Sequence, residues 1–140
     1  MRKLLNILVF AAFMSALTPI VAFGGDFDGS RPLLCAAIFS TECNAETQKC
    51  KSGAPWNINF PVFSEIDFKN KSISTVDAYK NERETRIESI DHLPDGRLSL
   101  QGDDGVYAWS MLISEETGSA TLSAAGEEIG FIIFGACTVR

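Results

Sequence analysis

The chain has 140 residues, of which 12 are basic and 18 acidic, for a net charge of −6. This acidic balance argues against nucleic acid or an anionic membrane surface as a partner, because both require a positively charged contact surface. The length suits a single domain with one modest hydrophobic core.

The first 22 residues resemble a secretory signal peptide. Arg2 and Lys3 form a short positive segment, residues 4–21 contain an apolar core, and Ala22 or Gly24 offers a small residue for cleavage. Cleavage would leave 10 basic and 18 acidic residues, a net charge of −8. No second run of 18 apolar residues follows, so we expect an exported chain, periplasmic or secreted, with no membrane span after cleavage.

The next segments are predicted to be a flexible N-terminal segment, a strand and a loop. Residues 23–32 are rich in turn formers, which predicts a flexible N-terminal segment. The apolar run 33–39 predicts a first strand. The polar stretch 41–55 holds Cys43 and Cys50 and little that could enter a core, so we expect a long loop constrained by a disulfide bond.

From residue 62 onward, apolar and polar residues alternate between turn signals, which predicts a series of hairpins. The expected strands cover residues 62–68, 72–76, 84–90, 97–101, 106–113, 119–124 and 129–139. Residues 77–91 also fit helical spacing, and strand is preferred for 84–90 because it lies within a run of hairpins. The last segment is apolar on both faces, which is typical of a strand covered on both sides.

These elements predict an all-β domain over residues 33–140. We expect an antiparallel up-and-down meander of about eight strands, curled into a closed or nearly closed small barrel of lipocalin-like shape. The first and last strands of such a barrel are neighbours. We therefore favour the pairs Cys35–Cys137 and Cys43–Cys50 among the three pairings that four cysteines allow. Their spacing does not suit a zinc site, and we expect no metal or cofactor.

One aromatic stripe is the candidate binding feature. Tyr107, Trp109 and Met111 share one side of the alternating segment 106–113, where they would form either the core or the wall of a cavity for an apolar ligand. The matching core candidates are Phe60, Phe63, Phe68, Phe131 and Phe134.

His92 is the only histidine. Asp91 and Asp95 stand close to it, as in an acid–base site, but it precedes a turn sequence at 93–96 and we expect an exposed side chain. The sequence also lacks the nucleophile elbow of serine hydrolases. It therefore predicts a protein that is not an enzyme.

Several short motifs resemble a family of small exported bacterial proteins of uncharacterised function. They are FDGS at 27–30, PLLCA at 32–36, EC at 42–43, IDF at 66–68, LQG at 100–102, and GF with FGAC within 130–137. The resemblance spans most of the chain after the signal segment. It implies export and the four-cysteine framework, and it carries no activity, substrate or catalytic residue.

Two hypotheses of function follow. The first is a non-catalytic exported module that binds another molecule or an unknown protein partner. The alternative is a carrier of a small apolar ligand in a barrel cavity. An interior cavity lined by Tyr107 and Trp109 would favour the carrier.

Overall fold

Ten β-strands and one short 3-10 helix make up most of the described part of the chain. The structure is a computed structural model that describes residues 26–76 and 82–140, so the predicted signal peptide, residues 1–22, lies outside it. In chain order the elements are β1 (Leu33–Asn44), β2 (Lys49–Gly53), η2 (Pro55–Ile58), β3 (Phe63–Asp67), β4 (Ser72–Val76), β5 (Glu82–Arg86), β6 (Ser89–Leu93), β7 (Arg97–Asp103), β8 (Ala108–Ser114), β9 (Ser119–Ala125) and β10 (Ile129–Val139). No helix in these two ranges is both long and apolar enough to cross a membrane.

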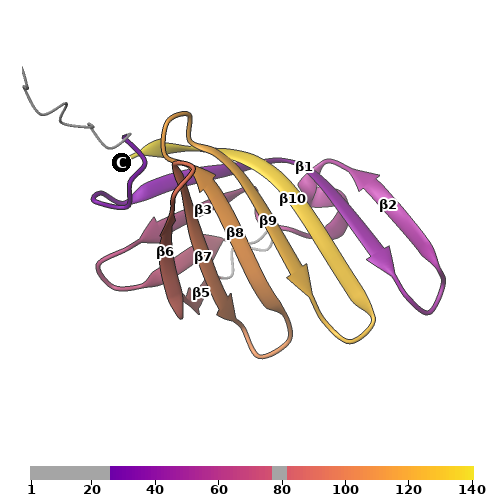
Figure 1. Ribbon diagram of the computed structural model, residues 1–140. Coiled ribbons are helices and arrows are strands. Elements are labelled where there is room, and N and C mark those ends of the chain that lie inside the picture. The colour runs from indigo at the N-terminus through magenta and orange to yellow at the C-terminus, as the bar shows by residue number, and fades with distance from the viewer. Residues whose placement is uncertain (1–25, 77–81) are drawn as a thin grey trace, which may run out of the picture.

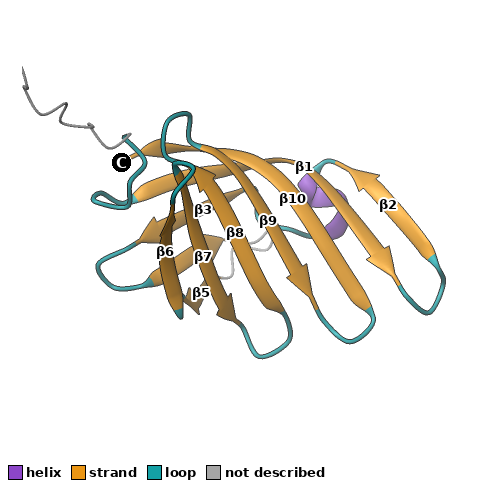
Figure 2. Ribbon diagram, viewed as in Figure 1, coloured by secondary structure: helices purple, strands orange, loops and turns teal. Residues whose placement is uncertain are grey.

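All ten strands belong to one antiparallel sheet that curls into a half-barrel (Figure 1). Their order is β5-β4-β3-β1-β10-β9-β8-β7-β6, with β2 paired to the second half of β1. Figure 2 shows how completely strand dominates the fold and how short most of the connections are. The predicted all-β, nearly closed barrel is therefore confirmed, with ten strands in the described residues instead of about eight.

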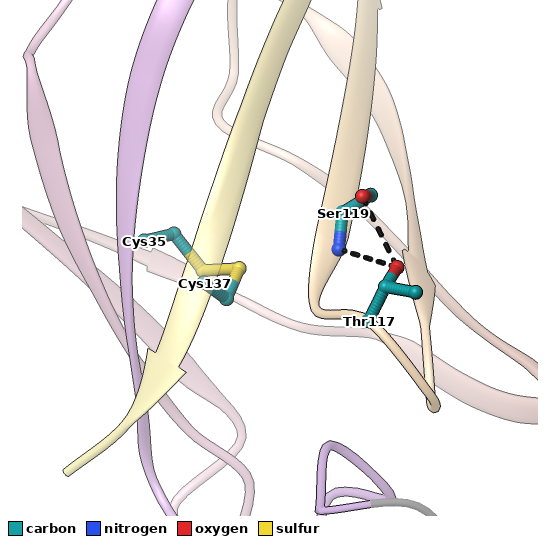
Figure 3. The surroundings of a disulfide bond; sticks show 4 residues. All are labelled: Cys35, Thr117, Ser119 and Cys137. Carbon is teal, nitrogen blue, oxygen red and sulfur yellow. Dashed lines mark hydrogen bonds between the residues drawn. A yellow bond between two sulfur atoms is a disulfide. The ribbon is translucent and has the colours of Figure 1, made fainter.

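The first and last strands lie side by side, as expected. β1 and β10 pair over almost their whole lengths, and their register places Cys35 directly opposite Cys137. A disulfide bond joins these two residues (Figure 3). The turn between β8 and β9 lies beside the bond, where the Cys137 N–H donates to the Gly118 carbonyl at 2.8 Å. The long-range pairing predicted from the sequence is confirmed.

The second predicted disulfide, Cys43–Cys50, is also present, but its surroundings differ from the prediction. The polar stretch 41–55 was expected to be a loop, and most of it is a hairpin of β1 and β2. Cys43 and Cys50 are direct cross-strand partners in that hairpin. The prediction was wrong because β1 pairs with β10 on one side and with β2 on the other, and this backbone pairing orders most of the stretch as strands.

The chain crosses the seam of the half-barrel between β5 and β6. The Ile87 N–H donates to a carbonyl of the β3–β4 turn, and the Glu88 N–H donates to a carbonyl of β7, both at 2.8 Å. This crossing divides the expected strand 84–90 into two strands on opposite edges of the sheet. Of the segment with helical spacing, residues 77–81 lie outside the described residues, and the described remainder contains no helix.

The core fills one end of the half-barrel. Five segments of the chain contribute its completely buried apolar side chains Leu33, Ile66, Ile87, Leu98, Leu100 and Ile113. Phe27 packs against this cluster, and its N–H donates to the Glu115 carbonyl at 3.3 Å. The N-terminal segment predicted to be flexible therefore has an anchor at Phe27, although residues 26–31 contain only turns and bends. We call this the closed end of the barrel.

Candidate functional site

The opposite end of the half-barrel holds a cavity of about 270 Å³. Its lining comes from both halves of the sheet and from the segment after η2: Ile58, Asn59, Phe60, Pro61, Ser64, Ile73, Thr75, Arg83, Thr85, Asp104, Tyr107, Trp109, Met111, Leu122, Ala124 and Phe131. Asn59, Arg83 and Asp104 are exposed, so they form the rim through which the cavity meets solvent. A dry engineered cavity of roughly 150 Å³ binds benzene, so this one has room for one or two fused rings or a short chain.

One wall of the cavity is aromatic. Ala124 on β9 lies between Trp109 on β8 and Phe131 on β10, its cross-strand partners on either side. The Tyr107 ring meets the Phe131 ring edge to face, with centroids 5.3 Å apart. Strict alternation along β8 turns Trp109 and Met111 inward, and the small side chain of Ala124 leaves open the space between the rings.

Trp109 is fixed in place by a glycine on the neighbouring strand. Gly102 on β7 is its cross-strand partner, and a Cβ atom at Gly102 would come within 2.5 Å of the Cζ2 atom of the indole. The ring edge therefore lies directly against the backbone of β7. The indole nitrogen is buried and has no hydrogen-bond partner among the described residues. The position of the ring is set by packing, not by its polar group.

The facing wall is polar. Thr75 on β4 is paired with Arg83 on β5, and Ile73 is paired with Thr85. Paired residues share a face of the sheet, and Ile73 belongs to the buried core, so all four side chains lie on the inner face. Arg83 and Thr85 thus stand across the cavity from the aromatic wall.

The rim carries one carboxylate that is already engaged. Oδ1 of Asp104 accepts hydrogen bonds from the backbone N–H groups of Val106 and Tyr107, at 3.0 and 2.7 Å. This Asx-type turn connects β7 to β8 and positions Tyr107 at the start of the aromatic wall. The carboxylate is turned toward its own loop.

The cavity narrows toward the middle of the barrel. Phe60, Ser64, Met111 and Leu122 also border a smaller void of about 30 Å³, together with residues of the central strands. Phe60 lies just after η2, and its N–H donates to the Pro55 carbonyl at 3.1 Å, which holds the loop against the opening. The space is therefore widest at the rim and closes around apolar groups inside.

His92 lies away from this cavity, at the closed end of the barrel. It is in β6, not in the turn that follows, and its side chain is exposed as expected. Its Nδ1 atom lies 2.6 Å from Oε1 of Glu115. Asp28 is nearby, and its pKa is lowered because the side chain and backbone of Ser30 donate hydrogen bonds to it. These groups form a surface cluster, and none of them lines the cavity.

The outer face of the sheet carries a second feature. Six large apolar side chains are between 39% and 66% exposed there, and we call them the outer patch: Leu34, Ile38, Phe39, Phe63, Ile132 and Phe134. Phe39 and Phe134 are cross-strand partners with ring centroids 6.3 Å apart. Phe63 and Phe134 were predicted to be core residues, and β10 was predicted to be covered on both faces. Both predictions were wrong, because only the inner face of the sheet is covered.

The predicted site residues are brought together. Tyr107, Trp109 and Met111 line one cavity, and two of the phenylalanine candidates, Phe60 and Phe131, line it with them. Sequence analysis missed Thr75, in the expected strand 72–76, and also Arg83 and Thr85, in the segment 77–91 that fitted both helix and strand. Within residues 26–76 and 82–140, no three His, Cys, Asp or Glu side chains are grouped as metal ligands would be.

Comparison of the chain with protein-family models, with curated proteins and with solved structures found no match.

Proposed function

We propose that this protein is a non-catalytic, exported protein that binds a small apolar molecule in the open end of its barrel. The observation that carries the proposal is the 270 Å³ cavity with an aromatic wall of Tyr107, Trp109 and Phe131. Binding sites for small molecules are concave and mostly apolar, with a few polar groups that fix orientation. Of the two functions considered from the sequence, the cavity supports the carrier.

Export is supported by two independent features. Both disulfide bonds belong to a small domain, and such bonds form and persist in oxidising compartments such as the periplasm or the extracellular space. The first 22 residues have the composition of a signal peptide. Non-catalytic binding is supported by the position of the histidine, which lies at the closed end and does not line the cavity.

A cavity-filling substitution tests the proposal. We expect the wild-type protein to bind 1-naphthalenemethanol, a neutral two-ring probe, in isothermal titration calorimetry. Ala124→Phe should weaken this binding at least about 10-fold, because the new ring occupies the space between Trp109 and Phe131. Filling an existing cavity should leave the free energy of unfolding unchanged or raise it by about 1 kcal/mol.

The matched control is Ala125→Phe, one residue further along β9 on an exposed position. Because successive strand residues point to opposite faces, this ring should lie outside the barrel and leave probe binding unchanged. Equal binding by wild type and Ala124→Phe would show that the probe binds elsewhere. No binding by the wild type would reject the proposed function.

The outer patch favours a second candidate function, contact with another protein surface. Isolated exposed apolar residues are common, but a contiguous group on one face marks an interaction site. The simplest occupant is a second copy of the chain, because a two-fold contact needs only one self-complementary surface. This interaction would leave the cavity on the inner face accessible.

Sedimentation velocity tests the second candidate. We expect the wild type to sediment as a dimer at about 50 µM and the double variant Phe39→Ser/Phe134→Ser as a monomer, since the apolar centre of a contact holds most of its energy. Val106→Ser removes an apolar side chain that is 69% exposed and lies in the β7–β8 turn, outside the outer patch, and this variant should remain dimeric. A monomeric wild type at this concentration would contradict the self-association.

A further inference from the structure

We infer that the ligand of this cavity is an amphiphilic anion, with one or two fused rings or a short chain against the aromatic wall and a carboxylate facing Arg83. This inference rests on the proposed function, because it names the ligand chemistry of the same cavity. It goes beyond an apolar carrier by assigning a charged recognition group.

The two walls of the cavity suit different parts of a ligand. Tyr107, Trp109 and Phe131 offer ring faces and edges that suit an apolar body. Arg83, with Thr75 beside it, offers a guanidinium and a hydroxyl across from those rings. A ligand that spans the cavity therefore meets apolar groups at one side and hydrogen-bond donors at the other.

Among the described residues that line the cavity, Arg83 is the only basic one. The guanidinium carries its charge at any physiological pH and presents a planar fork of donors that matches a carboxylate. Its position at the rim lets a bound carboxylate keep part of its hydration. The desolvation cost is thus lower than for a fully buried pair.

Among the described residues, the acidic neighbours of Arg83 do not replace the ligand's carboxylate inside the cavity. Glu82 and Glu84 are its neighbours on β5, and strand alternation directs them to the opposite face of the sheet. Asp104 shares the rim, but its carboxylate accepts hydrogen bonds from its own turn. The net charge, −6 for the whole chain and −8 after the proposed cleavage, repels anions at long range, and salt at physiological strength screens this repulsion beyond about 8 Å.

Two matched probes test the inference by calorimetry. Naphthalene-1-carboxylate and 1-naphthalenemethanol have the same rings and differ in charge. We expect the wild type to bind the carboxylate about 10-fold more tightly, the effect of one partly exposed charge-assisted hydrogen-bond pair. Arg83→Gln should remove this preference and leave the affinity for the alcohol unchanged.

Arg86→Gln is the control, because Arg86 lies on the same strand, is exposed, and alternates to the outer face. It should keep the full preference for the carboxylate. A salt titration of the wild type provides a measurement that needs no variant. Between 20 and 500 mM salt, the affinity for the carboxylate should fall about 10-fold, which is the size of its expected preference, and the affinity for the alcohol should not change.

The outcomes separate the two proposals. Equal binding of both probes by the wild type, or a preference that survives Arg83→Gln, overturns the anion inference and leaves the apolar carrier standing. Binding of neither probe overturns both. A preference lost in Arg83→Gln and kept in Arg86→Gln supports both.

Discussion

Removal of the disulfide between β1 and β10 should lower the free energy of unfolding by about 4–5 kcal/mol. The bond joins residues 102 apart in sequence, and in the chain-entropy model a loop of about 100 residues contributes about 4.7 kcal/mol by restricting the unfolded chain. Cys35→Ala/Cys137→Ala is the appropriate variant, because both cysteines are buried and alanine adds no polar atom. Urea unfolding, followed by tryptophan fluorescence, measures the loss.

This loss is large for a small domain. Single domains have total stabilities of about 5–15 kcal/mol, so the double variant should be close to unfolding at room temperature. The bond also fixes the register of the two central strands, from which the rest of the sheet extends on both sides. The same variant should therefore lose probe binding once it unfolds, without any direct contact between the disulfide and the ligand.

The second disulfide provides the comparison. Cys43→Ala/Cys50→Ala opens a loop with a sequence separation of only 7, and the same model gives about 2.5 kcal/mol for it. This hairpin lies beside the barrel and contributes no residue to the cavity, so probe binding should persist. Equal losses in the two double variants would contradict the account based on loop length.

The cysteine pairing could be predicted because it needs only the order of the strands. Cys35 and Cys137 lie in the first and last strong strand patterns, and an up-and-down barrel makes those strands neighbours. The prediction did not depend on the exact boundaries of the strands, so it holds although β1 extends to Asn44 and β2 was not predicted. Topology is robust where the pattern is repeated many times along the chain.

The choice of inner and outer face was predicted only in part. Alternation placed Trp109, Met111 and Ile113 together, and all three are buried. The same alternation put Phe63 on the face opposite Ile66, yet its apolar character suggested a core position, and the side chain is 58% exposed. In β10 both faces are apolar, so the sequence contains no signal for the uncovered one. Hydrophobicity alone does not distinguish a core from an exposed contact surface.

The polar wall of the cavity could not be predicted, because it depends on how the sheet curls. Arg83 and Thr85 belong to the segment that fitted both helix and strand. They reach the cavity because the chain crosses the seam at Ile87, through hydrogen bonds to segments on both sides of the barrel. Closure of the sheet by such long-range hydrogen bonds leaves no local pattern in the sequence. Tyr107 and Trp109 could be predicted to lie together because they alternate within one segment, 106–113, whereas Phe131 joins them from β10, two strands away.

Trp109→Ala should lower the free energy of unfolding by about 3 kcal/mol and weaken binding of 1-naphthalenemethanol. Replacement of a buried aromatic residue with alanine costs about 3–5 kcal/mol. Trp109 is only 9% exposed, but one side of its ring borders the open cavity. We expect the lower end of the range, because solvent can enter the enlarged space and fewer packing contacts are lost.

Two further variants separate the contribution of Trp109 packing to stability from the cost of its buried indole N–H. Trp109→Phe should cost less than about 1.5 kcal/mol, because the smaller ring also removes the indole N–H that has no partner among the described residues, and such groups cost about 1–3 kcal/mol when buried. Trp56→Ala removes the other tryptophan, which is 66% exposed, and should change stability by less than about 0.5 kcal/mol. Urea unfolding and calorimetry with the neutral probe measure both effects. A loss below about 1 kcal/mol for Trp109→Ala would exclude a role in the core, and unchanged probe binding would place the ligand away from the aromatic wall.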